Sequence, residues 1–143
     1  MPNGKTHDII TLITTPVVGL IGYNILDDYR LFLLLIISYI FSSFMFNGDL
    51  DTNSSVYNRW WFFKVIWVPY QIIFNHRSIF THGIIIGTIV RLIWISPLVI
   101  IIYRVFDFNL NLINSLIIIL GLELGNINHS LSDKIGSWLK SKF

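Results

Sequence analysis

The chain has 143 residues, of which 54% are apolar and only 13% are charged, and its mean hydropathy is +0.67. A water-soluble domain carries more charge, and a nucleic-acid-binding protein would show clustered Lys and Arg rather than a net charge of +2. The absence of cysteine excludes disulfides and thiolate metal sites, which leaves His, Asp, Glu and Asn as metal ligands. We therefore expect one membrane-embedded domain over residues 1–143 that does not bind nucleic acid.

The N-terminal segment MPNGKTHDIITLITTPVVGLIGYNIL contains a long apolar run. A secretory signal would need a small-residue cleavage site, and this segment lacks one. We therefore predict a retained first transmembrane helix at about Ile9 to Leu26. A second apolar segment, Leu31 to Phe46, follows the short connection DDYR. The two helices should form an antiparallel hairpin, with Asp27 and Asp28 in a solvated turn.

The stretch FNGDLDTNSS directly follows the second apolar segment. Its Asp-x-Asp-x-Asn pattern resembles the start of a calcium loop, but Ser54 stands where that loop needs glycine and Trp60 where it needs a bidentate acid. Asp49 and Asp51 therefore need another role. Their carboxylates can approach one ion only in a loop, which Gly48 and the neighbouring asparagines favour.

The next apolar region, RWWFFKVIWVPYQIIF from Arg59 to Phe74, differs in kind because it is rich in aromatic residues and includes Lys64 and Pro69. Proline disfavours helix at the preceding residue, Val68. Aromatic residues collect at membrane interfaces. We predict a re-entrant or surface-lying helix here, with a true fifth span as the alternative.

Two further apolar segments, Gly83 to Val105 and Leu110 to Ile127, complete an all-α integral membrane bundle of about four transmembrane helices plus an interfacial aromatic helix. With four spans, both termini and the long middle connection share one side of the membrane. That side carries Lys5, Arg59, Lys64, Arg77, Lys134, Lys140 and Lys142, whereas the other has Arg30 and Arg104. The excess of basic residues predicts that the first side is the cytoplasmic face of a bacterial inner membrane.

All four histidines lie at span ends on that same side, together with three aspartates. Alternating passes through the membrane should bring into one layer His7, Asp49, Asp51, His76, His82, His129 and Asp133. Neutral imidazoles and carboxylates are ligands that Zn, Mn or Fe accept. The pattern predicts a site for one or two divalent ions, with zinc favoured and manganese or iron as alternatives.

Local spacing supports this site to different degrees. His129 and Asp133 are four residues apart, so they share one face of a helix. His76 and His82 are six apart and can converge only if the chain turns between them, with Ser78 or Thr81 capping the third span.

Two charges lie deeper in the spans. Arg91 and Glu123 should lie at depths that differ by about 4 to 5 Å, which favours an intramembrane ion pair. The alternative is that Glu123 reaches the metal layer as a ligand or base.

The motifs THDII, GDLD, HRSIFTH and HSLSD resemble, in order, those of a bacterial family described as putative metal-binding membrane proteins. They are also similar, more loosely, to the inner-membrane metal-dependent hydrolases of the YdjM type, which are related to zinc-dependent phospholipase C and P1 nuclease. The resemblance covers nearly the whole chain and implies metal ligation by the seven His and Asp residues of the layer. This chain departs from the pattern of those families in the six-residue spacing of His76 and His82, and in having Asn47 and Thr52 near Asp-x-Asp.

The looser resemblance implies phosphoester hydrolysis, and the position of the His and Asp layer at the depth of the lipid headgroups makes these headgroups the expected substrates. Arg77 would pair with phosphate, and Asp51 or Asp133 would accept a proton from water. A non-catalytic metal-binding protein with a structural, assembly or regulatory role is the alternative. A small transporter is the third hypothesis, although repeat symmetry is absent. Association with a protein partner or a second copy stays open.

Overall fold

The structure is a computed structural model that describes residues 4–106 and 110–142. Within these ranges every regular element is helical, which confirms the all-α prediction. Four long helices form the frame: α1 (Gly4–Ile25), α2 (Tyr29–Met45), α6 (Ile86–Phe106) and α7 (Leu112–Lys142). Five short elements connect α2 to α6: η1 (Gly48–Asp51), α3 (Ser55–Asn58), η2 (Trp61–Trp67), α4 (Val68–Ile73) and α5 (Ile79–His82).

Four helical segments are long and apolar enough to cross a membrane: Gly4–Ile25, Tyr29–Asp51, Ile86–Phe106 and Leu112–Trp138. They correspond to the four predicted spans, and the second reaches sufficient length because η1 continues it. Their outer faces expose large apolar side chains such as Leu12, Leu20 and Ile93, each about two thirds exposed. Such faces suit contact with lipid rather than water.

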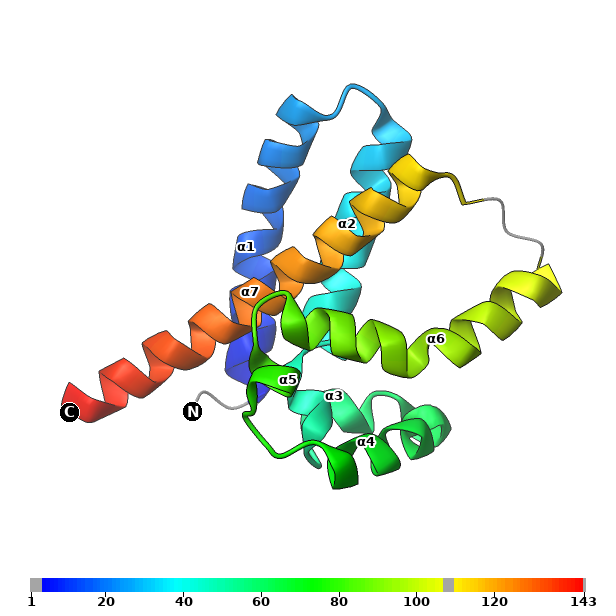
Figure 1. The fold of residues 1–143 in the computed structure, drawn as a ribbon. Coiled ribbons are helices and arrows are strands. Elements are labelled where there is room, and N and C mark those ends of the chain that lie inside the picture. Colours follow the sequence, from blue (N-terminus) through cyan, green and yellow to red (C-terminus); the bar gives the residue numbers. More distant parts are fainter. Residues whose placement is uncertain (1–3, 107–109, 143) are drawn as a thin grey trace.

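The helices α1, α2 and α7 pack together, with α7 crossing α2 along much of its length (Figure 1). Two glycines allow this close crossing. A Cβ at Gly121 would lie 2.7 Å from the Leu35 carbonyl oxygen, and one at Gly125 would lie 2.6 Å from Ser42 Cβ. Small residues let helix backbones approach closely in membrane proteins. The crossing therefore brings the C-terminal end of α2 beside the middle of α7.

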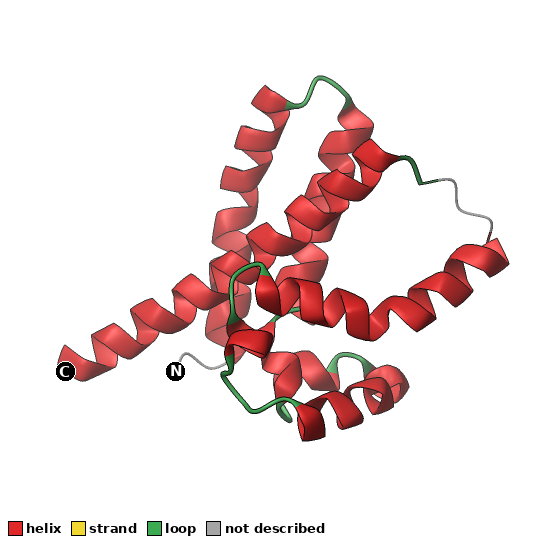
Figure 2. Cartoon of the chain, viewed as in Figure 1, coloured by secondary structure: helices red, strands yellow, loops and turns green. Residues whose placement is uncertain are grey.

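The third long helix, α6, runs away from the α1–α2 hairpin instead of along it (Figures 1 and 2). Its N-terminal half is tied to α5 by Arg91, which is fully buried and donates hydrogen bonds to the Thr81 carbonyl oxygen (2.6 Å) and Thr88 Oγ1 (3.3 Å). The guanidinium also lies 5.6 Å from the centroid of the Phe46 ring. Arg91 therefore connects α6 to the segment that carries His82.

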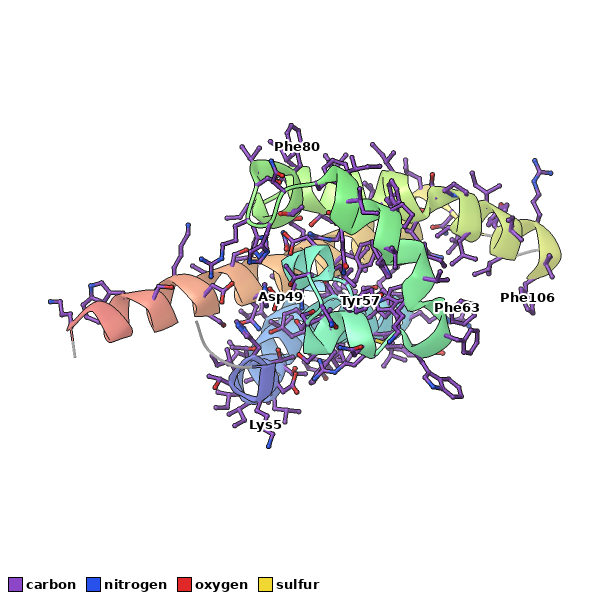
Figure 3. All side chains as sticks on the ribbon, turned by 90° about the horizontal axis from the view of Figure 1, so that it is seen from below. Lys5, Asp49, Tyr57, Phe63, Phe80 and Phe106 are labelled. Atoms are coloured by element: carbon purple, nitrogen blue, oxygen red, sulfur yellow. The ribbon has the colours of Figure 1, made fainter. Side chains whose placement is uncertain are left out.

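The aromatic region between Arg59 and Phe74 forms η2 and α4, so it provides no fifth spanning helix within the described residues. The predicted break at Val68 is only partly right. Val68 has helical dihedrals, and Pro69 sits in the first turn of α4, where its missing N–H costs nothing. One face is buried through Trp67 and Tyr70, while Trp61 is 77% exposed on the other. The aromatic side chains reach the periphery, where Phe63 lies in Figure 3.

Candidate metal centre

The carboxylates of Asp49 and Asp51 enter the site on η1, which follows α2 after two residues. The Asn47 side chain caps this turn by accepting a hydrogen bond from the Asp49 amide (3.1 Å), while its own amide donates to the Ser43 carbonyl oxygen (2.8 Å). Gly48 packs on His82, because a Cβ there would lie 2.9 Å from the His82 ring. The segment is thus a 3₁₀ turn rather than the predicted irregular loop, and its two carboxylates approach His82 from different sides.

The first group of candidate ligands comprises Asp49, His82, His129 and Asp133, which offer one atom each within 4.8 Å of one another. Asp49 Oδ1 lies 3.6 Å from His82 Nε2 and 3.4 Å from His129 Nε2. His129 Nε2 also lies 3.7 Å from Asp133 Oδ2. The side chains come from η1, α5 and α7, so the site depends on the packing of three elements. Asp49 lies centrally among the side chains in Figure 3.

A second group comprises Asp51, His76 and His82. Asp51 Oδ1 lies 2.8 Å from His76 Nδ1, and Asp51 Oδ2 lies 3.4 Å from His82 Nδ1. The same Oδ2 accepts a hydrogen bond from the Arg77 amide at 3.1 Å. His76 and His82 converge because the chain turns between them, as predicted. However, His82 belongs to the separate helix α5, and α6 begins only at Ile86, so neither Ser78 nor Thr81 caps the third span.

His7 joins the first group from the N-terminal turn of α1. Its Nε2 lies 3.2 Å from Asp133 Oδ1, and its ring centroid lies 4.4 Å from that of His129. The four histidines and three aspartates of the predicted layer are therefore all brought together, from four different parts of the chain.

Several polar atoms of this cluster are buried and have no hydrogen-bond partner in the part of the chain that the structure describes. They are His7 Nδ1, His82 Nε2 and both ring nitrogens of His129. Buried polar atoms in folded proteins are nearly always satisfied, so such a concentration needs an explanation. A divalent cation bound by imidazole nitrogens and carboxylate oxygens would satisfy these atoms. The donor set therefore fits a metal ion.

The electrostatics of the cluster act most clearly on His82, which lies outside the spanning segments. Burial of the ring lowers its pKa, but the carboxylates of Asp49 and Asp51 on either side outweigh burial and raise the pKa to about 9. The metal-free site therefore holds a proton at neutral pH where a cation would otherwise bind.

Two predicted site residues lie apart from the cluster. The Arg77 side chain faces a neighbouring pocket, and only its backbone amide contacts Asp51. Glu123 accepts a hydrogen bond from the Ile85 amide at 2.8 Å, close to the start of α6. Within residues 4–106 and 110–142 it forms no ion pair with Arg91, so that prediction is wrong. Arg91 finds carbonyl and hydroxyl oxygens instead.

Sequence reasoning missed the residues that support the cluster. Asn126 is fully buried and donates to the Gly83 carbonyl oxygen (3.4 Å), so it links α7 to the chain just after His82. Ser130, Lys134 and Ser137 line a pocket beside Asp133. Their spacing in the sequence could have indicated that they lie together, because residues three, four and seven apart share one face of a helix.

The family described as "Uncharacterized metal-binding protein (DUF2227)" matches residues 2–118. The match confirms the predicted resemblance to a metal-binding family; it includes the motifs of His7, Asp49 and His82 and ends before His129 and Asp133. An uncharacterized protein of Aquifex aeolicus (strain VF5) is 37% identical over 60 residues, which are 41% of this chain and 42% of that protein. The chain thus spans about two fifths of that relative's length. No solved structure matches. The similarity to YdjM-type hydrolases stays a prediction.

Proposed function

This chain belongs to the family of uncharacterized metal-binding proteins, and we propose that it is a membrane hydrolase whose divalent ion is held by Asp49, His82 and His129. The observation that carries the proposal is the convergence of these side chains, with Asp133, within 4.8 Å. Three protein ligands leave a coordination position open, as catalytic zinc sites do. Nitrogen and oxygen ligands suit zinc best here, and they also accept manganese or iron.

Asp51 is proposed as a positioning residue and not as a ligand. Both of its oxygens are already engaged by His76, His82 and the Arg77 amide, and its side chain is fully buried. A carboxylate that contacts the second nitrogen of a ligating imidazole fixes the ring orientation and the tautomer. Asp51 Oδ2 does this for His82 Nδ1 at 3.4 Å, together with Thr81 Oγ1 at 3.1 Å, while His82 Nε2 faces Asp49.

Asp133 is proposed as the general base. It lines a pocket, its side chain is 16% exposed, and His7 Nε2 holds one of its oxygens. A carboxylate at this position can accept a proton from an attacking water. The ion would supply Lewis acidity and lower the pKa of water to about 7. The resulting reaction class is hydrolysis of a phosphoester, and the substrate would be a lipid headgroup at the membrane surface.

We also propose that the four apolar helices span a bacterial membrane and that the metal centre lies at its cytoplasmic face. Arg59, Arg77 and Lys134 lie on the same side of the spans as the centre, whereas Arg30 and Arg104 lie at the opposite ends. Because the chain has no cysteine, single-cysteine variants at the exposed positions Lys134 and Arg104 can be labelled with an impermeant thiol reagent. Labelling of Lys134→Cys in intact cells, but not of Arg104→Cys, would contradict this orientation.

The test of the hydrolase uses purified wild-type protein and two variants. Elemental analysis should find about one ion per chain, and turnover should be measured on a chromogenic phosphodiester and on phosphatidylcholine micelles. Asp133→Asn should keep the ion and lose at least about a hundredfold in turnover. Asp49→Asn should lose the ion and the turnover together. Metal without turnover in the wild type would contradict the enzyme but not the site.

A structural ion is the second candidate, because the same cluster joins η1, α5 and α7. In that case Asp133 is a fourth ligand and closes the coordination shell. The Asp133→Asn variant separates the two candidates, since it should then lose the ion and destabilise the fold.

A further inference from the structure

A pocket of about 380 Å³ opens directly beside the metal centre. Its walls are formed by Arg77, His82, Ser130, Asp133, Lys134 and Ser137. Two of these residues, His82 and Asp133, belong to the metal centre itself. A molecule in this pocket would therefore lie next to the groups proposed to carry out hydrolysis.

One wall of the pocket is a polar stripe on α7. Ser130, Asp133, Lys134 and Ser137 follow one another at intervals of three, one and three residues, so they lie on one face of the helix. This stripe continues the face that carries His129. The hydroxyl of Ser130 is buried and has no hydrogen-bond partner among the described residues. It is therefore a donor that the protein itself does not use.

The opposite wall carries Arg77, which the backbone holds in an unusual conformation. Its φ is 61°, a left-handed value that residues with a Cβ disfavour, and its amide is fixed by Asp51 Oδ2 at 3.1 Å. The carboxylate that contacts His82 therefore also contacts the backbone that carries the Arg77 side chain. This arrangement couples the position of the guanidinium to the geometry of the metal centre.

Within the described residues, two cations of the pocket have no acidic partner. In the described part of the chain, neither Arg77 nor Lys134 lies within 4.0 Å of a carboxylate. Asp133 is the acidic residue that lines the pocket. Its carboxylate contacts His7 Nε2, and the positive charge of the ion would compensate its negative charge. Arginine and lysine together with hydroxyl donors form a suitable environment for an anion with several acceptor oxygens.

We propose that this pocket binds the phosphate group of the substrate, with charge from Arg77 and Lys134 and hydrogen bonds from Ser130 and Ser137. The proposal rests on the proposed function for the reaction, and it assigns the substrate class as a phosphate-bearing molecule. The group would be presented either by a lipid headgroup or by a soluble phosphate ester.

The experiment is calorimetric titration of metal-loaded protein in detergent with inorganic phosphate. Lys134→Ala and Arg77→Ala should each weaken phosphate binding about tenfold while the metal content stays at the wild-type value. Lys64→Ala is the matched control, because Lys64 is an exposed cation on η2 outside the pocket; it should bind phosphate like the wild type. No phosphate binding by the wild type, or equal loss in Lys64→Ala, would overturn the proposal.

Two further measurements distinguish a lipid from a soluble ester as the source of the phosphate group, and distinguish failure of the pocket from failure of the hydrolase. Competition by glycerol phosphate in solution would support a soluble ester, whereas preference for vesicles containing phosphatidic acid would support a lipid. Phosphate binding without any turnover would contradict the hydrolase and leave this pocket standing. Turnover with an unchanged KM in Lys134→Ala would contradict the pocket and leave the hydrolase standing.

Discussion

The two ends of the long helices differ in the burial of their polar side chains. At one end Asp27 and Asp28 are exposed, and Asp28 simply caps α2 by accepting a hydrogen bond from the Arg30 amide at 2.8 Å. At the other end His7, Asp51 and His129 are each less than a tenth exposed and face further His and Asp residues. Burial of polar groups costs free energy unless they find partners. The contrast indicates that the buried His and Asp cluster differs from the ordinary polar end of an apolar helix.

The largest effect should come from matched aspartate variants at the two ends. Asp49→Asn removes a carboxylate that lies 3.4 Å from His129 Nε2 and 3.6 Å from His82 Nε2, and we expect the bound ion to be lost completely. Asp28→Asn at the far end should leave metal content unchanged, since asparagine also caps helices. Elemental analysis of both purified variants checks this. Full metal content in Asp49→Asn would remove the distinction between the two ends.

A second comparison concerns two glycines in different helices. Gly121→Ala places a methyl group 2.7 Å from a backbone oxygen of α2, whereas Gly19→Ala in α1 meets only Ile36 Cδ1 at 3.9 Å. Overpacking costs about 1–3 kcal/mol, and alanine gains about 1 kcal/mol over glycine in a helix. Gly121→Ala should therefore lower the unfolding temperature, and Gly19→Ala should raise it slightly. Thermal unfolding followed by circular dichroism in detergent measures both, and equal shifts would contradict a tight α2–α7 crossing.

A smaller effect should separate the two aspartates of η1. Asp51→Asn keeps the size of the side chain but weakens its hold on the His82 and His76 rings. Loss of such an orienting partner typically costs about 10–100-fold in metal affinity. Competition against a chelator of known affinity should show that range, with the protein still able to bind the ion. Complete loss, as in Asp49→Asn, would identify Asp51 as a ligand.

Much of the fold follows from local pattern. The four apolar segments predicted the four long helices, because a spanning helix must satisfy its backbone internally and its length is set by the bilayer. The convergence of His7, Asp49 and His129 was predicted from the alternating direction of successive spans alone. The pattern could not predict that α6 leaves the hairpin, since this depends on where α5 ends and on the buried contacts of Arg91.

The finer details of the site also lay beyond the sequence. The similar depths of Arg91 and Glu123 in their helices were consistent with an ion pair. Glu123 instead accepts a hydrogen bond from the Ile85 amide, one of the donors that the start of a helix leaves unsatisfied. Likewise, the spacing of Asp49 and Asp51 did not say which approaches His129. That choice is made by the 3₁₀ turn that Asn47 caps and that Gly48 permits against the His82 ring.

The last prediction concerns the pH dependence of metal binding. Asp49 and Asp51 raise the pKa of His82 to about 9 against an ordinary 6.5. A proton on His82 therefore stabilises the metal-free fold fully below about pH 6.5, and this stability is lost as the pH rises through about 9. Because Nε2 must lose any proton before it can bind the ion, the affinity should rise about tenfold per pH unit from about pH 7 to 9. In Asp51→Asn, which lacks one of the two carboxylates that raise this pKa, the rise should level off at a lower pH. Chelator competition at several pH values measures both curves, and a flat wild-type curve would contradict binding of the ion by a His82 with a raised pKa.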